Sequence, residues 1–157
     1  MVHRRPSRGR DIVSRAKRSE MMRSVGQRET EEERVVAAVL KELGERFRAN
    51  IRSLPGSPDF GNRTRLWAIF VHGCFWHGHE HCRITKSNGK ARIPVRNAAY
   101  WSDKIESNKR RDRSKATQLR RLGYRVLTVW GCRLRDRDRL KRVLRSFLDR
   151  DPLRGAR

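Results

Sequence analysis

The chain has 157 residues, and its 40 Lys and Arg residues against 17 Asp and Glu residues give a formal net charge of +23 at pH 7. This length suits one domain that buries a hydrophobic core, and the lack of a long apolar run argues against a membrane span and a signal peptide. The charge exceeds what solubility requires, so we expect nucleic acid as the polyanionic partner, and a cytoplasmic protein that DNA binding holds at the nucleoid.

Both ends of the chain are predicted to lie outside an ordered domain that spans residues 18–150. Residues 1–17 should form a basic, flexible arm, because their composition cannot bury apolar surface. The arm either lies along DNA phosphates or is a solvated tail. A short basic helix over residues 11–25 would lead into the domain, and residues 151–157 should fray.

A capping box predicts where the first long helix begins. In Thr30-Glu31-Glu32-Glu33, the Thr30 hydroxyl can accept a hydrogen bond from the backbone N–H of Glu33 while the Glu33 carboxylate reaches back. The helix would extend over residues 30–43 with its apolar side chains on one face, and Gly44 would end it.

Three strands should follow as an antiparallel meander. Residues 46–51 are predicted to form the first strand, and the turn-forming segment 54–60 runs into the second. Residues 66–71 are apolar on both faces, which is typical of a buried central strand. This arrangement places Asp59 and His72 at strand positions that can meet across neighbouring strands.

The rest of the chain predicts two helices and one more strand. Residues 83–96 are basic and expected to be irregular. A long helix over residues 97–122, a strand over 124–130 and a final helix over 136–149 follow. This order of elements predicts an α/β fold, a single-domain mixed β-sheet flanked by helices.

Two polar residues interrupt the apolar stripe of the long helix. Asn108 and Asp112 recur at helical spacing with Trp101, Ile105 and Leu119. Because a buried polar group must find partners, such a break is expected near a functional site. Alternatively, the helix is rotated so that water reaches both residues.

The loop after the buried strand, residues 72–82, is the part of the sequence richest in reactive side chains and is called the reactive loop below. Together with a cysteine after the last strand, it supplies a Cys₃His set: Cys74, His79, Cys82 and Cys132. Tetrahedral Zn²⁺ takes four such ligands, and a closed site of this kind is structural. His81 is an alternative ligand to His79. Burial of three free thiols in an apolar core is the other interpretation.

A carboxylate and two histidines in this region suit phosphodiester hydrolysis. Asp59 can hold Mg²⁺, and His72 or His77 can orient or deprotonate water. Each residue alone also has a simpler interpretation, because Asp59 follows a proline in a turn and a histidine at a strand end is often structural. A Cys74 nucleophile is disfavoured, since a zinc-bound thiolate is already occupied.

Three large aromatic residues lie in or near the reactive loop. Phe75 and Trp76 are adjacent in a segment rich in Gly and His, and Trp101 lies in the long helix. They can belong to the core. In so basic a protein, we favour the alternative that they stack on bases or wedge between them.

Several segments together resemble the very short patch repair endonucleases, the Vsr-type DNA mismatch nickases. The resemblance covers most of residues 18–132 and is carried by these motifs: His72-Gly73-Cys74-Phe75-Trp76-His77, the segment 54–60, Tyr100-Trp101, Asn108, Asp112 and the segment 129–132. It implies a fold like that of type II restriction endonucleases. It also implies Mg²⁺-dependent nicking 5′ of the thymine in a T:G mismatch, which deamination of 5-methylcytosine produces, and a structural Zn²⁺.

The resemblance assigns roles to individual residues. It implies that Asp59 and the backbone carbonyl of Val71 bind Mg²⁺, and that His72 and His77 are catalytic, with His77 as general base. Supporting active-site positions go to Glu33, Asn108 and Asp112. The intercalating residues would be Phe75, Trp76 and Trp101, which enter the base stack beside the mismatch.

Other functions remain open at this stage. A restriction-type endonuclease, an inactive zinc-stabilised DNA-binding module and an RNA-binding protein would each also explain a basic chain. For the mismatch nickase we expect double-stranded DNA as partner, a monomeric state that suits cutting one strand, and downstream proteins that continue the repair. Residues 83–96 and the final helix match the family only loosely, so the sequence context of the mismatch is not inherited.

Overall fold

The computed structural model describes residues 15–80, 82, 86–87, 90–91 and 98–150. Its helices and strands, in chain order, are α1 (Arg15–Glu42), β1 (Arg48–Ala49), β2 (Phe60–Asn62), β3 (Trp67–His72), β4 (Lys86–Ser87), β5 (Lys90–Ala91), α2 (Ala98–Arg121), β6 (Arg125–Trp130), the 3₁₀ turn η1 (Gly131–Arg133) and α3 (Arg137–Asp149). The arm predicted for residues 1–17, except its last three residues, and the tail at 151–157 lie outside the described residues. None of the described helices is long and apolar enough to cross a membrane.

The main sheet has four strands in the order β1-β2-β3-β6. The pairs β1/β2 and β2/β3 are antiparallel, whereas β3 and β6 run parallel. The predicted meander and mixed sheet are therefore confirmed. Because β3 and β6 are parallel with His72 opposite Trp130, the carboxyl ends of both strands lie at the same edge of the sheet.

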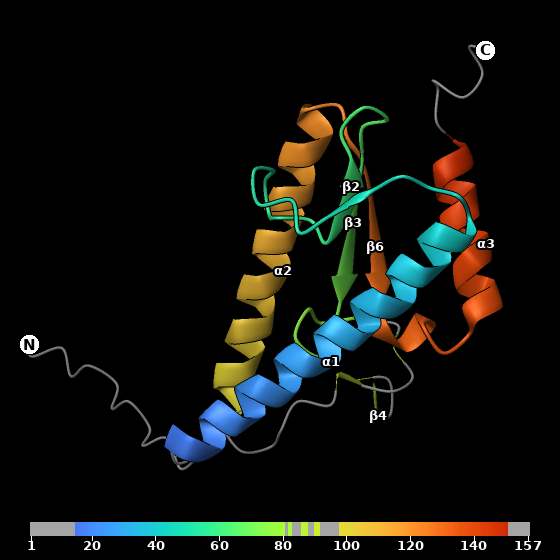
Figure 1. Cartoon of the computed structure of the whole chain (residues 1–157). Coiled ribbons are helices and arrows are strands. Elements are labelled where there is room, and N and C mark those ends of the chain that lie inside the picture. Colours follow the sequence, from blue (N-terminus) through green and yellow to red (C-terminus); the bar gives the residue numbers. More distant parts are fainter. Residues whose placement is uncertain (1–14, 81, 83–85, 88–89, 92–97, 151–157) are drawn as a thin grey trace, which may run out of the picture.

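Helices cover both faces of the sheet (Figure 1). α1 and α3 pack on one face, where Leu40 and Leu144 join Trp67 and Ile69 of β3 in the larger core cluster. α2 covers the opposite face, where Leu119 belongs to the smaller cluster. Successive side chains of a strand alternate between faces, so the even-numbered residues of β3, which end at His72, face α2. The buried strand thereby delivers one histidine to the α2 side.

The first helix differs from its prediction. A single helix runs from Arg15 to Glu42, where the sequence pattern indicates a short helix over 11–25 and a new start at Thr30. Thr30 is thus an interior residue of α1 and not an N-cap. The capping-box pattern reflects a local preference only. Gly26, which lies between the two predicted helices, costs about 1 kcal/mol inside a helix, and a long helix can sustain this cost.

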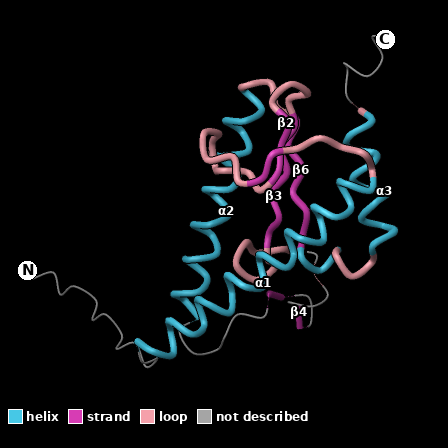
Figure 2. Tube along the Cα trace, in the orientation of Figure 1, coloured by secondary structure: helices cyan, strands magenta, loops and turns pink. Residues whose placement is uncertain are grey.

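Two further segments differ from their predictions. β1 comprises only Arg48–Ala49, because Asn50 adopts a positive φ of 50° that ends the strand. Part of the stretch 83–96, expected to be irregular, forms the antiparallel pair β4/β5. The tube view in Figure 2 shows β4 apart from the main sheet.

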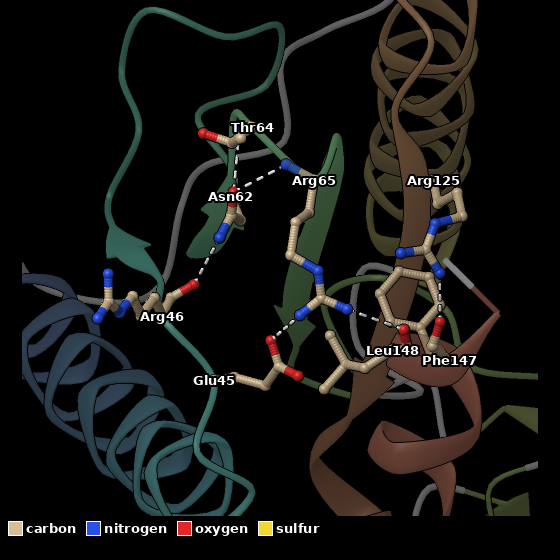
Figure 3. Close-up of polar contacts among 8 residues, drawn as sticks. All are labelled: Glu45, Arg46, Asn62, Thr64, Arg65, Arg125, Phe147 and Leu148. Atoms are coloured by element: carbon tan, nitrogen blue, oxygen red, sulfur yellow. Dashed lines mark hydrogen bonds and ion pairs between the residues drawn. The ribbon is translucent and has the colours of Figure 1, made fainter. Parts of the chain in front are cut away.

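Two arginines fasten α3 to the sheet (Figure 3). Arg65 donates to the backbone carbonyl of Leu148 at 3.2 Å and pairs with the Glu45 carboxylate. Arg125 donates to the carbonyl of Phe147, and its guanidinium lies 5.1 Å from the centre of the Phe147 ring. Both cations meet the carbonyls that the last turn of a helix leaves unpaired, where the helix dipole favours positive charge.

Candidate active site and metal centre

A cleft of about 970 Å³ opens on the α2 side, at the carboxyl ends of β3 and β6. Its walls include five of the six predicted catalytic residues, all except Asn108: Glu33, Asp59, His72, His77 and Asp112. These residues come from α1, the turn before β2, the end of β3, the loop after it and α2. The fold therefore gathers in one place side chains that are up to 79 positions apart in the sequence (112 − 33).

Asp59 is held at the position where β3 ends. Its Oδ2 accepts a hydrogen bond of 2.7 Å from the backbone N–H of Val71. The turn that carries Asp59 contains the fully buried Pro58, which anchors it. One carboxylate and a backbone carbonyl are oxygen ligands of the kind that Mg²⁺ combines with water molecules, so Asp59 beside Val71 suits such an ion.

The two histidines of the cleft stack on each other. The rings of His72 and His77 have centroids 3.8 Å apart and an interplanar angle of 11°. His77 Nδ1 lies 2.6 Å from Asp112 Oδ2. If the ring donates this hydrogen bond, Asp112 orients the imidazole and leaves Nε2 to accept a proton.

His72 differs from His77 in its burial. Only 8% of its surface is exposed. Burial, and then the charge of His77, lower the pKa of His72 from 6.5 to about 4; Asp112 opposes this shift and Lys115 adds to it. His72 is therefore a neutral imidazole at neutral pH.

The ligand atoms of His72, His77 and Asp112 all lie within 4.8 Å of one another, so this trio could itself hold a metal ion. Two parallel rings, however, hold their nitrogen lone pairs in parallel planes, which do not converge on one ion. The His77 nitrogen nearest the carboxylate is also engaged by Asp112. The arrangement suits acid/base chemistry better than coordination.

The polar break in α2 is explained by contacts with the reactive loop. Asn108 Nδ2 donates to the backbone carbonyl of Trp76 at 2.8 Å, and Asp112 bonds His77. Both residues are partly buried. Of the two alternatives for this helix, the one in which the polar residues find protein partners is confirmed.

Four N and S donors converge beside the cleft, as the sequence predicted. The ligand atoms of Cys74, His79, Cys82 and Cys132 lie within 4.8 Å of one another. Cys132 Sγ lies 3.4 Å from His79 Nδ1, and Cys82 is fully buried. Such a closed Cys₃His set can hold a metal ion and fits a tetrahedral one. The alternative ligand His81 lies outside the described residues.

Trp130, to which the sequence analysis assigned no role, lies between this cluster and the histidine pair. Its ring is parallel to that of His79, with centroids 4.3 Å apart, and it meets the His72 ring edge-on at 5.6 Å. A continuous line of rings thus joins a donor of the Cys₃His cluster to the histidine pair. Its position opposite His72 in the sheet could not be known before the strands were paired.

The predicted intercalating residues form an aromatic cluster on α2 and the loop. Trp76 and Trp101 have ring centroids 5.5 Å apart, and Phe75 lies 5.2 Å and 5.7 Å from them. All three are partly exposed, and none belongs to either buried core cluster. Tyr100, 60% exposed, extends the cluster from Trp101 at 5.3 Å. The interpretation of these residues as core is wrong.

Comparison with known proteins identifies the family. Residues 10–83 match the family model described as DNA mismatch endonuclease Vsr. The chain is 41% identical over 139 residues to the type II nicking enzyme V.XorIIP of Xanthomonas oryzae pv. oryzae, covering 88% of this chain and 97% of that protein. It is 42% identical over 130 residues to the DNA mismatch endonuclease Vsr of Escherichia coli K12, covering 83% and 79%. The type II nicking enzyme V.NmeAIP of Neisseria meningitidis serogroup A is 36% identical over 143 residues, covering 88% and 97%. The chain therefore belongs to the Vsr family of DNA mismatch endonucleases.

Proposed function

We propose that this protein is a Mg²⁺-dependent endonuclease that nicks one DNA strand 5′ of the thymine in a T:G mismatch and so begins very short patch repair of deaminated 5-methylcytosine. The observation that carries the proposal is that one cleft holds the Asp59 carboxylate and the His77–Asp112 pair. The family names and the charge of +23 support DNA as substrate. The substrate would place the enzyme at chromosomal DNA.

The residues of the cleft divide the hydrolysis between them. Asp59 and the carbonyl of Val71 would hold Mg²⁺, which when bound supplies positive charge to the phosphate oxygens. His77 Nε2 takes the proton of the attacking water, and Asp112 stabilises the resulting imidazolium through Nδ1. The water oxygen forms a bond to phosphorus as the ester bond to the leaving oxygen breaks.

Two other site residues hold this pair in place, and a third lines the cleft beside it. The neutral ring of His72 stacks on His77 and limits its rotation. Asn108 fixes the backbone of the loop at Trp76. Glu33 brings a carboxylate from α1 to the cleft wall. These contacts preorganise the base before DNA binds, which lowers the cost of reaching the reactive geometry.

The aromatic cluster would read the mismatch. Phe75, Trp76 and Trp101 are partly exposed, and the Asn108 bond ties their loop to α2. Inserting a side chain between base steps costs a few kcal/mol, and less at a mispaired step. The cluster would therefore enter a T:G step more readily than a paired one.

The Cys₃His cluster would hold Zn²⁺ with a structural role. It connects the loop after β3 to η1, because Cys132 follows β6 whereas the other three donors lie in the loop. Burial raises the pKa of the Cys74 thiol to about 12 without metal, so zinc binding must displace a tightly held proton. The bound metal would then hold the loop against η1.

A strand-specific nicking assay tests the proposed function. Duplexes that carry one T:G mismatch, or T:A at the same position, are labelled on either strand and incubated with and without Mg²⁺. Nicking of only the T-containing strand of the mismatched duplex, and only with Mg²⁺, is expected. Equal cutting of both duplexes would identify a restriction-type enzyme, and binding without cutting would identify a DNA-binding module.

A further inference from the structure

Lys115 lines the cleft, and none of the residues that the structure describes pairs with its charge. It lies on α2 three residues after Asp112, and both line the cleft. Spacing of i and i+3 on a helix usually permits an ion pair. Asp112 is bonded to His77 instead, and Lys115 forms no ion pair with any of the residues that the structure describes.

The contrast with Lys109 is informative. Lys109 also lines the cleft, but its ammonium is bonded to Glu80 at 2.8 Å and to Glu106 at 3.0 Å. The charge of Lys109 is thus neutralised within the protein. Lys115 is the one of these two lysines whose charge is left for a ligand.

The stem of Lys115 is held against the turn that carries Asp59. A Cβ atom added to Gly56 would lie 2.8 Å from Lys115 Cδ and 2.9 Å from its Cβ, so the absence of a side chain at Gly56 makes room for this stem. The φ of Gly56 is +80°, a conformation that also favours glycine. Packing against Gly56 restricts the lysine, which lowers the entropy cost of placing its ammonium in the cleft.

We propose that Lys115 binds a non-bridging oxygen of the DNA phosphate that is cut. The cleft walls carry four carboxylates, which repel a phosphate, and cations that offset them besides the two lysines: Glu33, Asp59, Glu80 and Asp112, and Arg113, Arg120 and Arg133. Lys115 differs from these arginines because its stem packs on Gly56, in the turn that carries Asp59, so its ammonium is the cation placed beside that carboxylate. An ammonium placed before the reaction stabilises the extra negative charge that develops on the phosphate oxygens. The inference rests on the proposed function, because it assigns a contact within the same reaction.

Neutral phosphates provide a test that does not depend on nicking. A methylphosphonate, which lacks the negative charge, is placed at one position at a time along the T-containing strand, and Kd is measured with Ca²⁺ in place of Mg²⁺. For the unmodified protein, a neutral linkage at the site of cutting should weaken binding about tenfold. In Lys115→Gln the same linkage should cost nothing further, because the partner charge is gone.

Lys104→Gln is the matched control. Lys104 lies on the same helix, is exposed and is absent from the cleft wall, so its removal changes the total charge equally. In this variant the neutral linkage should still cost about tenfold. If the neutral linkage at every position raises Kd by the same factor in Lys115→Gln as in the unmodified protein, the proposed contact does not exist.

Single-turnover nicking at saturating DNA then separates the two hypotheses. Lys115→Gln should slow nicking about 100-fold, Lys115→Arg should restore part of the rate, and Lys104→Gln should leave it within twofold. A normal rate in Lys115→Gln overturns the inference alone. If the unmodified protein does not nick the T:G duplex, the proposed function fails. The Kd values of the variants on the methylphosphonate duplexes still decide whether Lys115 contacts a phosphate.

Discussion

Trp130 lies flat on His79, with ring centroids 4.3 Å apart and an interplanar angle of 3°. The same indole meets His72 edge-on, so it separates the Cys₃His cluster from the histidine pair and contacts both. A residue in this position should affect the metal site and the active site together.

Trp130→Leu should therefore weaken metal retention and slow nicking, whereas Trp130→Phe should preserve most of both because it keeps an aromatic ring. Metal content after dialysis and the single-turnover rate check this. A Leu variant that keeps its metal and its rate would show that the stacked rings are incidental packing.

Asp59→Asn should abolish nicking without abolishing DNA binding. The amide retains the shape of the carboxylate and can still accept from the N–H of Val71, but it lacks the charge that attracts Mg²⁺. Nicking rate and Kd on the T:G duplex are to be measured side by side. An undiminished rate in this variant would remove Asp59 from the metal site.

Trp76→Ala should reduce the preference for T:G over T:A along with affinity. The side chain is partly exposed and packs against Trp101, so its loss removes stacking surface while the cleft residues stay intact. Stacking of one base on an aromatic ring contributes about 1–3 kcal/mol. The ratio of Kd values for the two duplexes gives the result, and an unchanged ratio would contradict the wedge role.

Cys132→Ser should lower zinc content and melting temperature together. The backbone N–H of Cys132 donates to Cys74 Sγ at 3.3 Å, and its own sulfur lies beside His79, so it closes the cluster from η1. Structural zinc contributes about 10–16 kcal/mol of apparent binding free energy in zinc-finger peptides, comparable to the whole stability of a domain, about 5–15 kcal/mol. Full zinc occupancy in the variant would exclude Cys132 as a ligand.

The buried His72 predicts how stability changes with pH. Burial lowers its pKa from 6.5 to about 4, so between these values the unfolded chain binds a proton that the folded protein does not. The contribution of this group to the free energy of unfolding should be fully present above about pH 6.5 and should fall as the pH drops towards 4. The loss over this range is roughly 3 kcal/mol.

Urea unfolding of the unmodified protein and of His72→Asn at several pH values isolates this contribution. The difference in free energy of unfolding between the two proteins should shrink as the pH falls, because the unfolded variant has no imidazole at this position to take up a proton. A difference that does not vary between pH 7 and pH 4 would contradict the buried neutral histidine.

The sequence alone predicted what local pattern controls. The apolar run at 66–71 predicted a buried strand, and β3 (Trp67–His72) is buried throughout. The helix predicted over 136–149 begins one residue later, because Asp136 is its N-cap and accepts from the N–H of Arg139 at 2.9 Å. Ligand spacing likewise predicted the Cys₃His set, because three of its donors lie within nine residues. Such features depend on neighbours in the chain.

Contacts between distant segments were decided only by the tertiary structure. The continuity of α1 through Thr30 was also decided there, because packing and helix cooperativity override a local capping signal. The bonding of Asp112 to His77 rather than to Lys115, and the placement of Trp130 between two histidines, depend on how α2 and β6 pack on β3. The residues joined by these contacts are at least 35 positions apart in the chain, and Trp130 and His72 are 58 positions apart (130 − 72). No local pattern encodes which of the possible partners will be nearest.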